Sequence, residues 1–338
     1  MAKVSEFRYD LPGGAIAQTA VEPRHDARLL DTRDHSDHRF LDLPSLLDPG
    51  DLVVVNETRV RAARLSGRRV DSGGQVELLL LDRDREGRWE ALARPARRLR
   101  RGVVIDLHET TATVIDNFGE GRVLVKLDAD DEEAVVERIG ILPLPPYFTG
   151  ELDDPGRYQT IYARTPGSAA APTAGLHFTE EVMAGLSTRR IEMARVDLHV
   201  SLDTFRPMMV EEVSDHVMHS EWCAIPEETA RSVARAREEG NRVVAVGTTV
   251  VRALETFARA DGTVEAGEAE TDLFLQPGSD FRVVDGLVTN FHLPGSSLLV
   301  LLAGFMGPGW RQAYRAALDR GYRFLSFGDA MYAERANT

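Results

Sequence analysis

The feature that most constrains the fold is a block of short strand-like runs, from about Val60 to Asp128, inside a chain that otherwise alternates strands with helices. The runs include GGQVELLLLD, GVVIDL and TATVIDNF, and Gly, Asp and Asn turn residues separate them. Short β-rich runs divided in this way are typical of a small antiparallel barrel. The helical run DDEEAVVERIG and the proline-rich LPLPPY come next, so we expect an exit helix and a rigid linker after the barrel.

The segments on both sides of this block predict an α/β body. Before it, LVVVN at 52–56 is an apolar strand that we expect to pair with later strands. After Tyr158, one helix is expected to begin at Thr179, an N-cap followed by two glutamates, and another to run from Pro226 to Gly240. RVVAVG is typical of a buried strand, and GTT leads from it into the helix VVRALETFARA, which completes a βα unit.

The expected fold class is therefore α/β, with a discontinuous α/β body and an inserted small antiparallel β-barrel domain. Residues 1–58 and 152–338 form the α/β domain in this prediction, and residues 59–151 form the barrel with its exit helix and linker. A chain of 338 residues is long enough for two domains with separate cores.

Hydropathy and cysteine content narrow the class of protein. No stretch reaches the roughly 18 uninterrupted apolar residues of a membrane span, and the charged first residues lack the apolar core of a secretory signal. We therefore expect a soluble cytoplasmic protein without a membrane partner. The single cysteine, Cys223, excludes an internal disulfide and a cysteine-cluster metal site, and its neighbours predict a buried core position.

Charge is distributed unevenly along the chain. The formal net charge of −14 opposes nucleic-acid binding, because Lys and Arg drive the binding of phosphates. Between Arg59 and Lys126, however, 15 basic residues stand against 10 acidic ones. Their densest cluster comprises Arg94, Arg97, Arg98, Arg100 and Arg101. Taken alone, this basic module is either a solvated face or a surface for nucleic acid.

Two segments combine small residues with polar ones in the second half of the chain. In AAPTAGLHF, 170–178, small residues let a ligand approach the backbone, and His177 precedes a helix N-terminus. The same segment is compatible with a tight turn whose histidine caps or packs. In LHVSLDTFRP, 198–207, strand alternation would place His199, Ser201 and Asp203 on one face, lining a cleft or facing solvent.

Further polar segments follow. The spacing of His216, His219 and Glu221 suits either a metal site or general acid–base groups, and we expect no metal. In VGTTVVRALE, 246–255, Gly-Thr-Thr stands between a strand and a helix, where α/β proteins bind ligands and backbone N–H groups favour a carboxylate. Arg252 and Glu255 are expected to extend this polar surface. Neither of the usual glycine-rich nucleotide loops is present.

These segments resemble a known family, the S-adenosylmethionine:tRNA ribosyltransferase-isomerases of queuosine biosynthesis. The matching motifs are collinear and cover almost the whole chain: FRYDLP, RLL, GDLVVVNETRV, ARLSG, LPLPPY, RYQTIYA, AAPTAGLHFTEE, LHV, TFRP, MHSE, AVGTT, VRALE, LFLQPG, TNFHLP and YRFLSFGDAM. The family's fold, a discontinuous α/β body with an inserted β-barrel, agrees with the pattern described above.

The resemblance implies a transferase that consumes S-adenosylmethionine as a ribosyl donor and needs no metal. It moves and isomerises the ribosyl moiety onto the 7-aminomethyl-7-deazaguanine base of tRNA, which gives epoxyqueuosine-tRNA and releases adenine and methionine. The positive sulfonium acidifies the C5′ hydrogens, so a positioned base can form an ylide that expels adenine. Such a site needs a base, an acid and groups that hold the carboxylate and ribose hydroxyls.

The candidate site residues come from the matching motifs. The acid–base candidates are His177, His199, His219 and Glu221. The substrate-binding candidates are Arg28, Asn56, Arg59, Arg64, Thr173, Ala174, Gly175, Phe178, Thr204, Gly247, Thr248, Thr249, Arg252, Asn290 and His292, and of these Arg59 and Arg64 are expected to hold tRNA phosphate.

Some positions depart from the family pattern. Ser201 and Asp203 stand where the family usually has glycine, and Ala62 stands where it tends to have proline. Side chains at 201 and 203 would remodel the pocket. This keeps open a diverged relative that cleaves S-adenosylmethionine with a small-molecule acceptor or none. A non-catalytic nucleic-acid-binding protein and a metal hydrolase are weaker alternatives.

Overall fold

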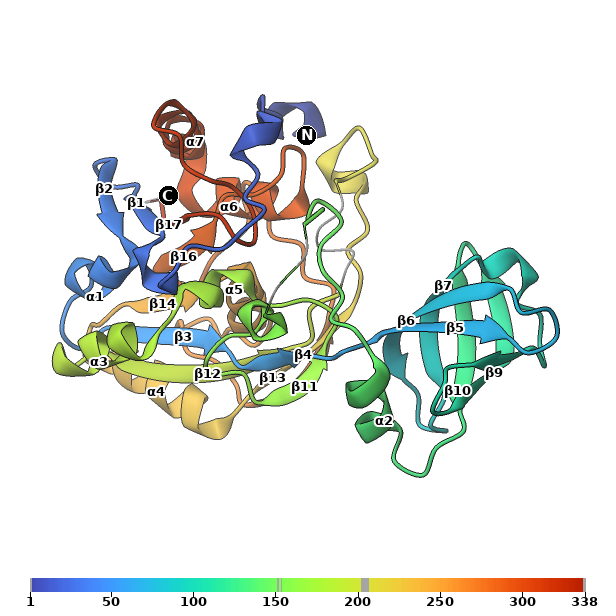
Figure 1. Ribbon diagram of the computed structural model, residues 1–338. Helices are drawn as coiled ribbons and strands as arrows, with labels where there is room; N and C mark the ends of the chain where they lie inside the picture. Colours follow the sequence, from blue (N-terminus) through green and yellow to red (C-terminus); the bar gives the residue numbers. More distant parts are fainter. Residues whose placement is uncertain (1, 151, 153, 202–206, 337–338) are drawn as a thin grey trace. The chain divides into compact units, whose positions relative to one another are not determined.

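The computed structural model describes residues 2–150, 152, 154–201 and 207–336, and it confirms an α/β body with a closed antiparallel β-barrel (Figure 1). The backbone divides into two compact units. Unit 1 comprises Met1–Arg59, Pro145–Thr165 and Ala171–Thr338, and unit 2 comprises Val60–Leu144 and Pro166–Ala170.

Unit 1 is built on a mixed sheet of nine strands. Their order across the sheet is β15 (Gly267–Thr271), β13 (Glu221–Ile225), β12 (Glu192–Leu198), β3 (Leu52–Asn56), β14 (Val243–Val246), β16 (Gly286–Asn290), β17 (Ala330–Glu334), β1 (Arg28–Asp31) and β2 (Ser36–Arg39). Strand β3 runs parallel to both of its neighbours, β12 and β14, and β14 runs parallel to β16. The run LVVVN therefore pairs with later strands as predicted, and all five of its residues are buried because helices cover both faces.

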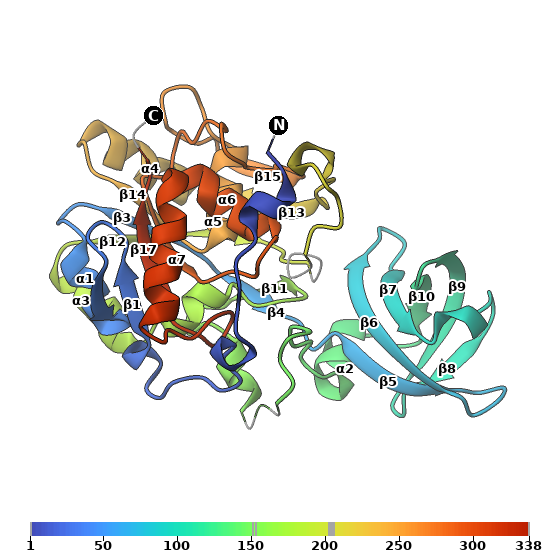
Figure 2. The same cartoon turned by 90° about the horizontal axis from the view of Figure 1, so that it is seen from above.

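Helices cover the sheet in two layers. The helices of the described chain are α1 (Leu43–Leu46), α2 (Glu132–Ile139), α3 (Glu180–Thr188), α4 (Glu227–Glu238), α5 (Thr248–Thr256), α6 (Ser297–Met306) and α7 (Trp310–Asp319). On one face, α1 and α3 pack with Val53 and Val55 of β3 in a continuous apolar core. Helix α3 leads into β12 on one side of β3, whereas α4 leads into β14 on the other side and α5 follows β14. Because crossovers between parallel strands are right-handed, α4 and α5 lie on the opposite face of the sheet from α3 (Figure 2).

The starts of these helices follow the sequence signals. Helix α3 begins after Thr179, α4 after Pro226 and α5 after Gly247, as expected. Gly247 has φ +93°, a backbone conformation that residues other than glycine rarely adopt.

The described chain also contains short 3₁₀ helices. They are η1 (Val4–Phe7), η2 (Gly13–Ala15), η3 (Arg24–Asp26), η4 (Phe40–Asp42), η5 (Ala96–Arg98), η6 (Pro155–Tyr158), η7 (Thr173–His177), η9 (Val213–Asp215) and η10 (Gly307–Gly309).

One predicted strand is wrong in part. The segment 198–207 was expected to be a strand with His199 and Ser201 on one face, but β12 ends at Leu198 and residues 199–201 are irregular. The reason is a contact between residues 20 positions apart: the backbone N–H of Ser201 donates to the Glu221 carboxylate (2.7 Å) instead of to a strand partner. Asp203, expected on the same face, lies outside the described residues.

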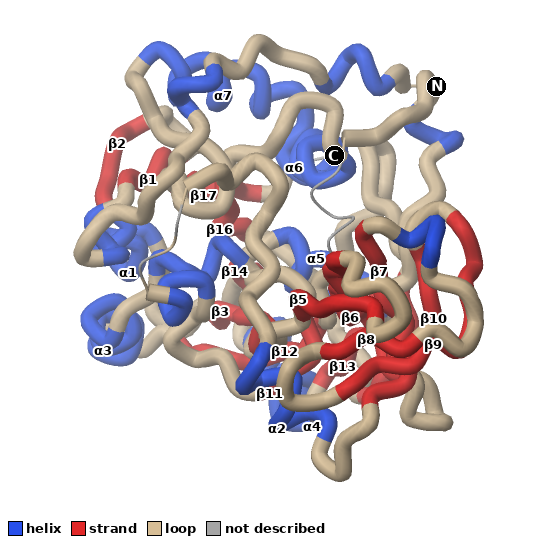
Figure 3. The backbone as a smooth tube through the Cα atoms, turned by 45° about the vertical axis from the view of Figure 1, so that its right-hand side comes forward, coloured by secondary structure: helices blue, strands red, loops and turns tan. Residues whose placement is uncertain are grey.

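Unit 2 is the closed barrel. Its strands follow one another around the barrel in the order β10 (Arg122–Leu127), β7 (Trp89–Arg94), β6 (Gln75–Arg83), β5 (Arg64–Arg69), β8 (Val104–Asp106) and β9 (Thr111–Gly119), all antiparallel (Figure 3). A separate two-stranded sheet is formed by β4 (Thr58–Val60) and β11 (Thr165–Ser168). Trp89 is fully buried, and its indole N–H donates to Glu132 of α2 (2.7 Å), which fixes the exit helix on the barrel.

The fold brings several loops to one edge of the nine-stranded sheet. Strands β3, β12, β14 and β16 are mutually parallel, so their carboxyl ends meet at the same edge. The chain passes from β3 to β12 on one side and then to β14 on the other side of β3. Such a change in strand order leaves a crevice outside the carboxyl ends, where open α/β sheets bind ligands.

Candidate functional site

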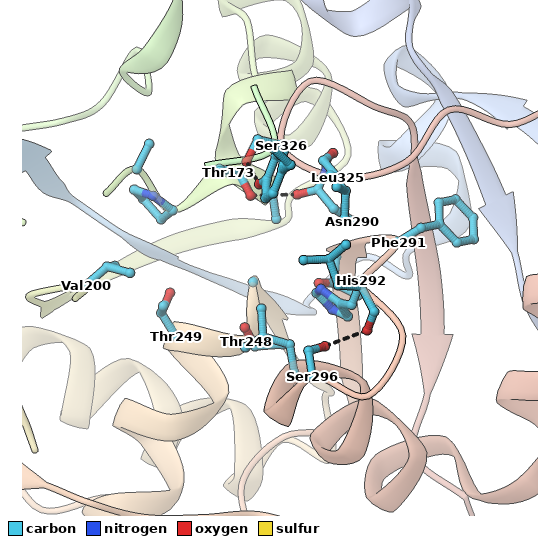
Figure 4. Close-up of a pocket in the computed structure, with 18 residues that line it drawn as sticks. Thr173, Val200, Thr248, Thr249, Asn290, Phe291, His292, Ser296, Leu325 and Ser326 are labelled. Carbon is cyan, nitrogen blue, oxygen red and sulfur yellow. Dashed lines mark hydrogen bonds between the residues drawn. The ribbon is translucent and has the colours of Figure 1, made fainter. Parts of the chain in front are cut away.

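A pocket with about 590 Å³ of empty volume opens at this edge of the sheet (Figure 4). Three segments form most of its wall: 171–174 before and within η7, 247–249 at the start of α5, and 289–293 at the end of β16. The other lining residues are Tyr147, Val200, Ser296, Leu298, Leu325 and Ser326.

Asn290 holds two of these walls together. Its side-chain oxygen accepts a hydrogen bond from the Thr173 hydroxyl (2.9 Å), drawn as a dashed line in Figure 4. Its amide nitrogen donates to the carbonyl of Leu325 (3.2 Å), and the residue is buried. These bonds fix which way the amide points, because only the oxygen can accept from Thr173 and only the nitrogen can donate to Leu325.

The N-terminus of α5 forms the opposite wall. Thr248 and Thr249 line the pocket in the first turn, where backbone N–H groups and the helix dipole favour a negative group. Asn56, at the end of β3, donates to the Thr249 hydroxyl (3.4 Å) and to the Leu198 carbonyl (3.0 Å), and its oxygen accepts from the Leu198 N–H (3.2 Å). Asn56 is fully buried and does not line the pocket, so it positions Thr249 and the end of β12.

His292 is the one histidine among the described residues that line the pocket. Its Nε2 lies 3.1 Å from the Thr289 hydroxyl. Its backbone N–H donates to the Tyr314 hydroxyl oxygen (2.8 Å), and its carbonyl accepts from the Tyr9 hydroxyl. Burial lowers the pKa of His292 to about 3, so the ring is neutral at physiological pH. A neutral imidazole is thus presented beside the α5 wall.

The polar side chains that line the pocket stand among apolar ones and, in the described chain, carry no formal charge. Hydroxyl groups come from Tyr147, Thr173, Thr248, Thr249, Thr289, Ser296 and Ser326. One amide and one neutral imidazole complete its polar groups, and no Asp, Glu, Lys or Arg belongs to its lining in the described chain. Such a surface suits hydroxyl groups and uncharged ring nitrogens, with the helix N-terminus as its one electropositive end.

His177, an acid–base candidate, lies outside this pocket. Its two ring nitrogens face the backbone carbonyls of Ala174 (3.1 Å) and Gly328 (2.9 Å), and its ring stacks on Phe40 with 4.9 Å between centroids. Burial lowers its pKa. Both nitrogens lie against backbone carbonyls, and the neutral ring has one N–H to donate to one of them, so His177 ties the η7 wall to the segment that carries Leu325 and Ser326.

Glu221 and Arg252, predicted respectively as an acid–base group and a binding group, pair with each other. The Arg252 guanidinium contacts one Glu221 oxygen and also donates to the carbonyls of Thr271 and Leu273 (3.1 Å each). The other Glu221 oxygen accepts from the Ser201 N–H. Both residues are 4% exposed and neither lines the pocket. The pair therefore fixes the segment that places Val200 in the pocket wall.

His199 and His219 also lie outside the pocket lining. The His199 ring packs on Trp222 (4.5 Å between centroids), and its Nε2 is 3.9 Å from Asp197. His219 is exposed in the loop before β13. Glu255, expected to extend the polar surface of α5, instead accepts from the backbone N–H groups of residues 282–284.

The remaining predicted binding residues divide into three groups. Ala174 and Gly247 line the pocket beside the threonines. Gly175 and Phe178 serve packing: a Cβ on Gly175 would lie 2.1 Å from the Tyr162 hydroxyl, and Phe178 is fully buried. The Arg28 guanidinium donates to the Asp329 carboxylate and to a carbonyl at the end of α7. Arg59 lies on β4 and Arg64 on β5. Thr204 lies outside the described residues.

The sequence prediction missed several lining residues. Tyr147 and Ser326 face the pocket with 2.5 Å between their hydroxyl oxygens, and burial raises the pKa of Tyr147 to about 12, so it stays protonated. Thr289 and Ser296 were missed as well. Tyr147, Thr289 and Ser326 lie within motifs already recognised, LPLPPY, TNFHLP and YRFLSFGDAM, but nothing in those patterns says that these hydroxyls converge.

Three further features of the described chain concern metal binding, its cysteine and membrane insertion. No group of three or more His, Cys, Asp or Glu residues with the arrangement of a metal site occurs in it. Cys223 is free and fully buried, as its neighbours predicted. Among the residues described, no helix is both long and apolar enough to cross a membrane.

Comparison with known proteins identifies relatives over almost the whole length of the chain. The model of the family described as "Queuosine biosynthesis protein" matches residues 4–333. A protein of Moorella thermoacetica named S-adenosylmethionine:tRNA ribosyltransferase-isomerase is 49% identical, with 97% of this chain and 99% of that protein covered. One of the same name from Heliobacterium modesticaldum is 50% identical, with 97% and 99% covered. The crystal structure of S-adenosylmethionine tRNA ribosyltransferase from Thermotoga maritima is 37% identical, with a TM-score of 0.56 and 97% and 99% covered.

Proposed function

The chain belongs to the queuosine biosynthesis protein family, and we propose that it is an S-adenosylmethionine:tRNA ribosyltransferase-isomerase whose donor binds in the hydroxyl-lined pocket of unit 1. The pocket carries this proposal, because it lies at the carboxyl edge of the sheet and joins a helix N-terminus to neutral donors and acceptors. We further propose that the acceptor is the 7-aminomethyl-7-deazaguanine base of tRNA. The products are then epoxyqueuosine-tRNA, adenine and methionine.

The chemistry of the pocket supports a definite orientation of the donor. The methionine carboxylate is negative, so it belongs at the α5 N-terminus beside Thr248 and Thr249. The ribose hydroxyls and adenine need uncharged hydrogen-bond partners, which Thr173 and Asn290 supply on the opposite wall. The nucleoside therefore spans the pocket from the helix terminus to η7.

His292 is the acid–base group that this geometry favours. A sulfonium is positive, and a neutral imidazole beside it avoids the repulsion that a protonated histidine would cause. In this proposal the lone pair of the neutral ring accepts the C5′ proton while the C–H electron pair remains on carbon as the ylide. Because burial lowers the pKa of the ring to about 3, it is a weak base that holds this proton only transiently. His177 and Glu221 then act through the backbone they hold, as positioning residues.

The proposal is tested by incubating the enzyme with S-adenosylmethionine, with and without tRNA that carries the aminomethyl-deazaguanine base. Mass spectrometry of the tRNA and chromatography of adenine and methionine measure the products. Release of both that depends on the modified tRNA, with the ribosyl-derived mass added to the tRNA, is the expected result. Release without tRNA would favour the small-molecule or acceptor-free reaction instead. Action on tRNA agrees with the cytoplasmic location expected from the sequence.

Two pocket variants connect the activity with the site. Thr248→Val removes one hydroxyl at the α5 terminus and His292→Gln removes the imidazole. We expect the first to raise KM for S-adenosylmethionine and the second to lower kcat, because the two residues face different parts of the donor. Thr188→Val, on the exposed end of α3, is a matched control that should leave both unchanged.

A further inference from the structure

Five arginines of the barrel stand together on one turn. They are Arg94, Arg97, Arg98, Arg100 and Arg101, here called the arginine turn, which runs from the end of β7 through η5 to the loop before β8. All five are exposed, and within the described chain none forms a salt bridge. Many other arginines of unit 2 do have a carboxylate partner: Arg61, Arg69, Arg83, Arg88, Arg122 and Arg138.

The backbone of the arginine turn is fixed on the barrel. Leu99, in its middle, is fully buried. The Asn117 side-chain amide of β9 donates to the carbonyls of Ala96 (3.0 Å) and Leu99 (2.8 Å), and the Gly102 N–H donates to Val114 (2.8 Å). The turn therefore presents its guanidinium groups from a backbone that is already ordered, which lowers the entropic cost of binding.

The charge of the turn is not balanced by carboxylates near it in the described chain. The chain carries a formal charge of −14, yet from Arg94 to Ile105 it contains five arginines and no Asp or Glu. Like charges held close together repel each other, and the acidic groups available elsewhere do not neutralise these five. Guanidinium groups match phosphate oxygens in geometry and lose little on desolvation, so a phosphodiester backbone suits this surface.

We propose, on the basis of the proposed function, that the arginine turn docks the phosphate backbone of the tRNA substrate. Contacts to phosphates position the nucleic acid without reading its sequence, so this surface contributes affinity and leaves base recognition to other residues. Docking at the turn should be strongly dependent on salt, because each neutralised phosphate releases counterions.

The test compares two variants with equal changes in charge. Arg97→Gln/Arg98→Gln/Arg100→Gln removes three charges from the turn. Arg231→Gln/Arg259→Gln/Arg315→Gln removes three exposed arginines of unit 1. Fluorescence anisotropy measures the tRNA Kd over a series of salt concentrations, kinetics give KM and kcat for tRNA, and calorimetry gives the affinity for S-adenosylmethionine.

For the turn variant we expect the tRNA Kd at about 0.1 M salt to rise roughly tenfold or more, and the log–log salt slope to fall by about 2–3. Its kcat and its affinity for S-adenosylmethionine should match the wild type. Equal tRNA Kd and slope in the two variants would overturn the proposal while leaving the reaction intact. A wild type that binds tRNA through the turn but transfers nothing would overturn the proposed reaction and retain the docking surface.

Asn117→Ala is a second variant that keeps every charge. It removes the amide that holds the Ala96 and Leu99 carbonyls, so the turn should bind tRNA more weakly with nearly the same salt slope. A larger loss of slope than in the triple variant would contradict docking by the arginines. Equal thermal unfolding of the triple variants and the wild type shows that folding is not the cause.

Discussion

The buried pair of Glu221 and Arg252 gives the sharpest prediction about how the pocket wall is held. Arg252 binds Glu221 and the carbonyls of Thr271 and Leu273, and Glu221 also accepts the Ser201 N–H. Arg252→Met leaves the buried Glu221 carboxylate without its cation. Loss of one partner from a buried pair typically costs about 3–5 kcal/mol.

The size of the stability loss distinguishes a structural role of this pair from a catalytic one. With about 2–4 °C of melting temperature per kcal/mol for domains of this size, Arg252→Met should lower Tm by roughly 6–20 °C. Glu221→Gln should destabilise to a comparable degree, because the guanidinium then lacks its anion. The double variant Glu221→Gln/Arg252→Met should lose clearly less than the sum of the two single variants, since neither charge is left alone.

The assay combines urea unfolding with S-adenosylmethionine calorimetry and steady-state kinetics. We expect both single variants to raise KM for S-adenosylmethionine, because Val200 and Ser201 are no longer held, and to lower kcat much less. A Glu221→Gln enzyme that unfolds like the wild type but loses about a thousandfold in kcat would refute this reasoning. Glu221 would then touch the reacting atoms, as the sequence first indicated.

Three other predictions follow from individual contacts. Burial, together with neighbouring Glu57, raises the pKa of Asp197 to about 6. The folded state therefore keeps a proton that the unfolded state releases near pH 4. The stability that this proton contributes is present below about pH 4 and is lost as pH rises through 6. In urea unfolding, the free energy of unfolding of Asp197→Asn should rise relative to that of the wild type by about 2 kcal/mol between pH 4 and pH 7. A difference between the two proteins that does not change with pH would contradict the raised pKa. Gly175→Ala should cost roughly 1–3 kcal/mol because its Cβ would lie 2.1 Å from the Tyr162 hydroxyl, and Tyr162→Phe should recover much of that loss, which thermal unfolding of the single and double variants measures. The NMR shift of the His292 ring should stay constant from pH 5 to pH 8 because burial holds its pKa at about 3, whereas a titration in that range would show that the ring is accessible to solvent.

Much of the fold could be predicted because it rests on local signals. The barrel strands show alternation and turn residues, and α5 begins where Gly247 supplies a left-handed φ of +93° between an apolar strand and a helix. The threonines that follow it line the pocket as expected from their position at a strand end. These features depend on residues close together in the chain, which a sequence pattern records directly.

The assignments that depend on long-range contacts could not be predicted. Glu221 meets Arg252 across 31 residues, and His177 meets the Gly328 carbonyl across 151. A motif containing a histidine or glutamate looks the same whether the side chain faces a ligand or a backbone carbonyl. Tyr147 and Ser326 illustrate the converse, because their hydroxyls meet in the pocket although 179 residues separate them.

A crystal structure with S-adenosylmethionine bound tests the central claim most directly. The account predicts the nucleoside between Thr173 and Asn290 on one wall and Thr248 and Thr249 on the other, with the His292 ring nearest to the C5′ carbon. Density for the nucleoside beside His219 and Glu221, or outside the pocket altogether, would contradict it.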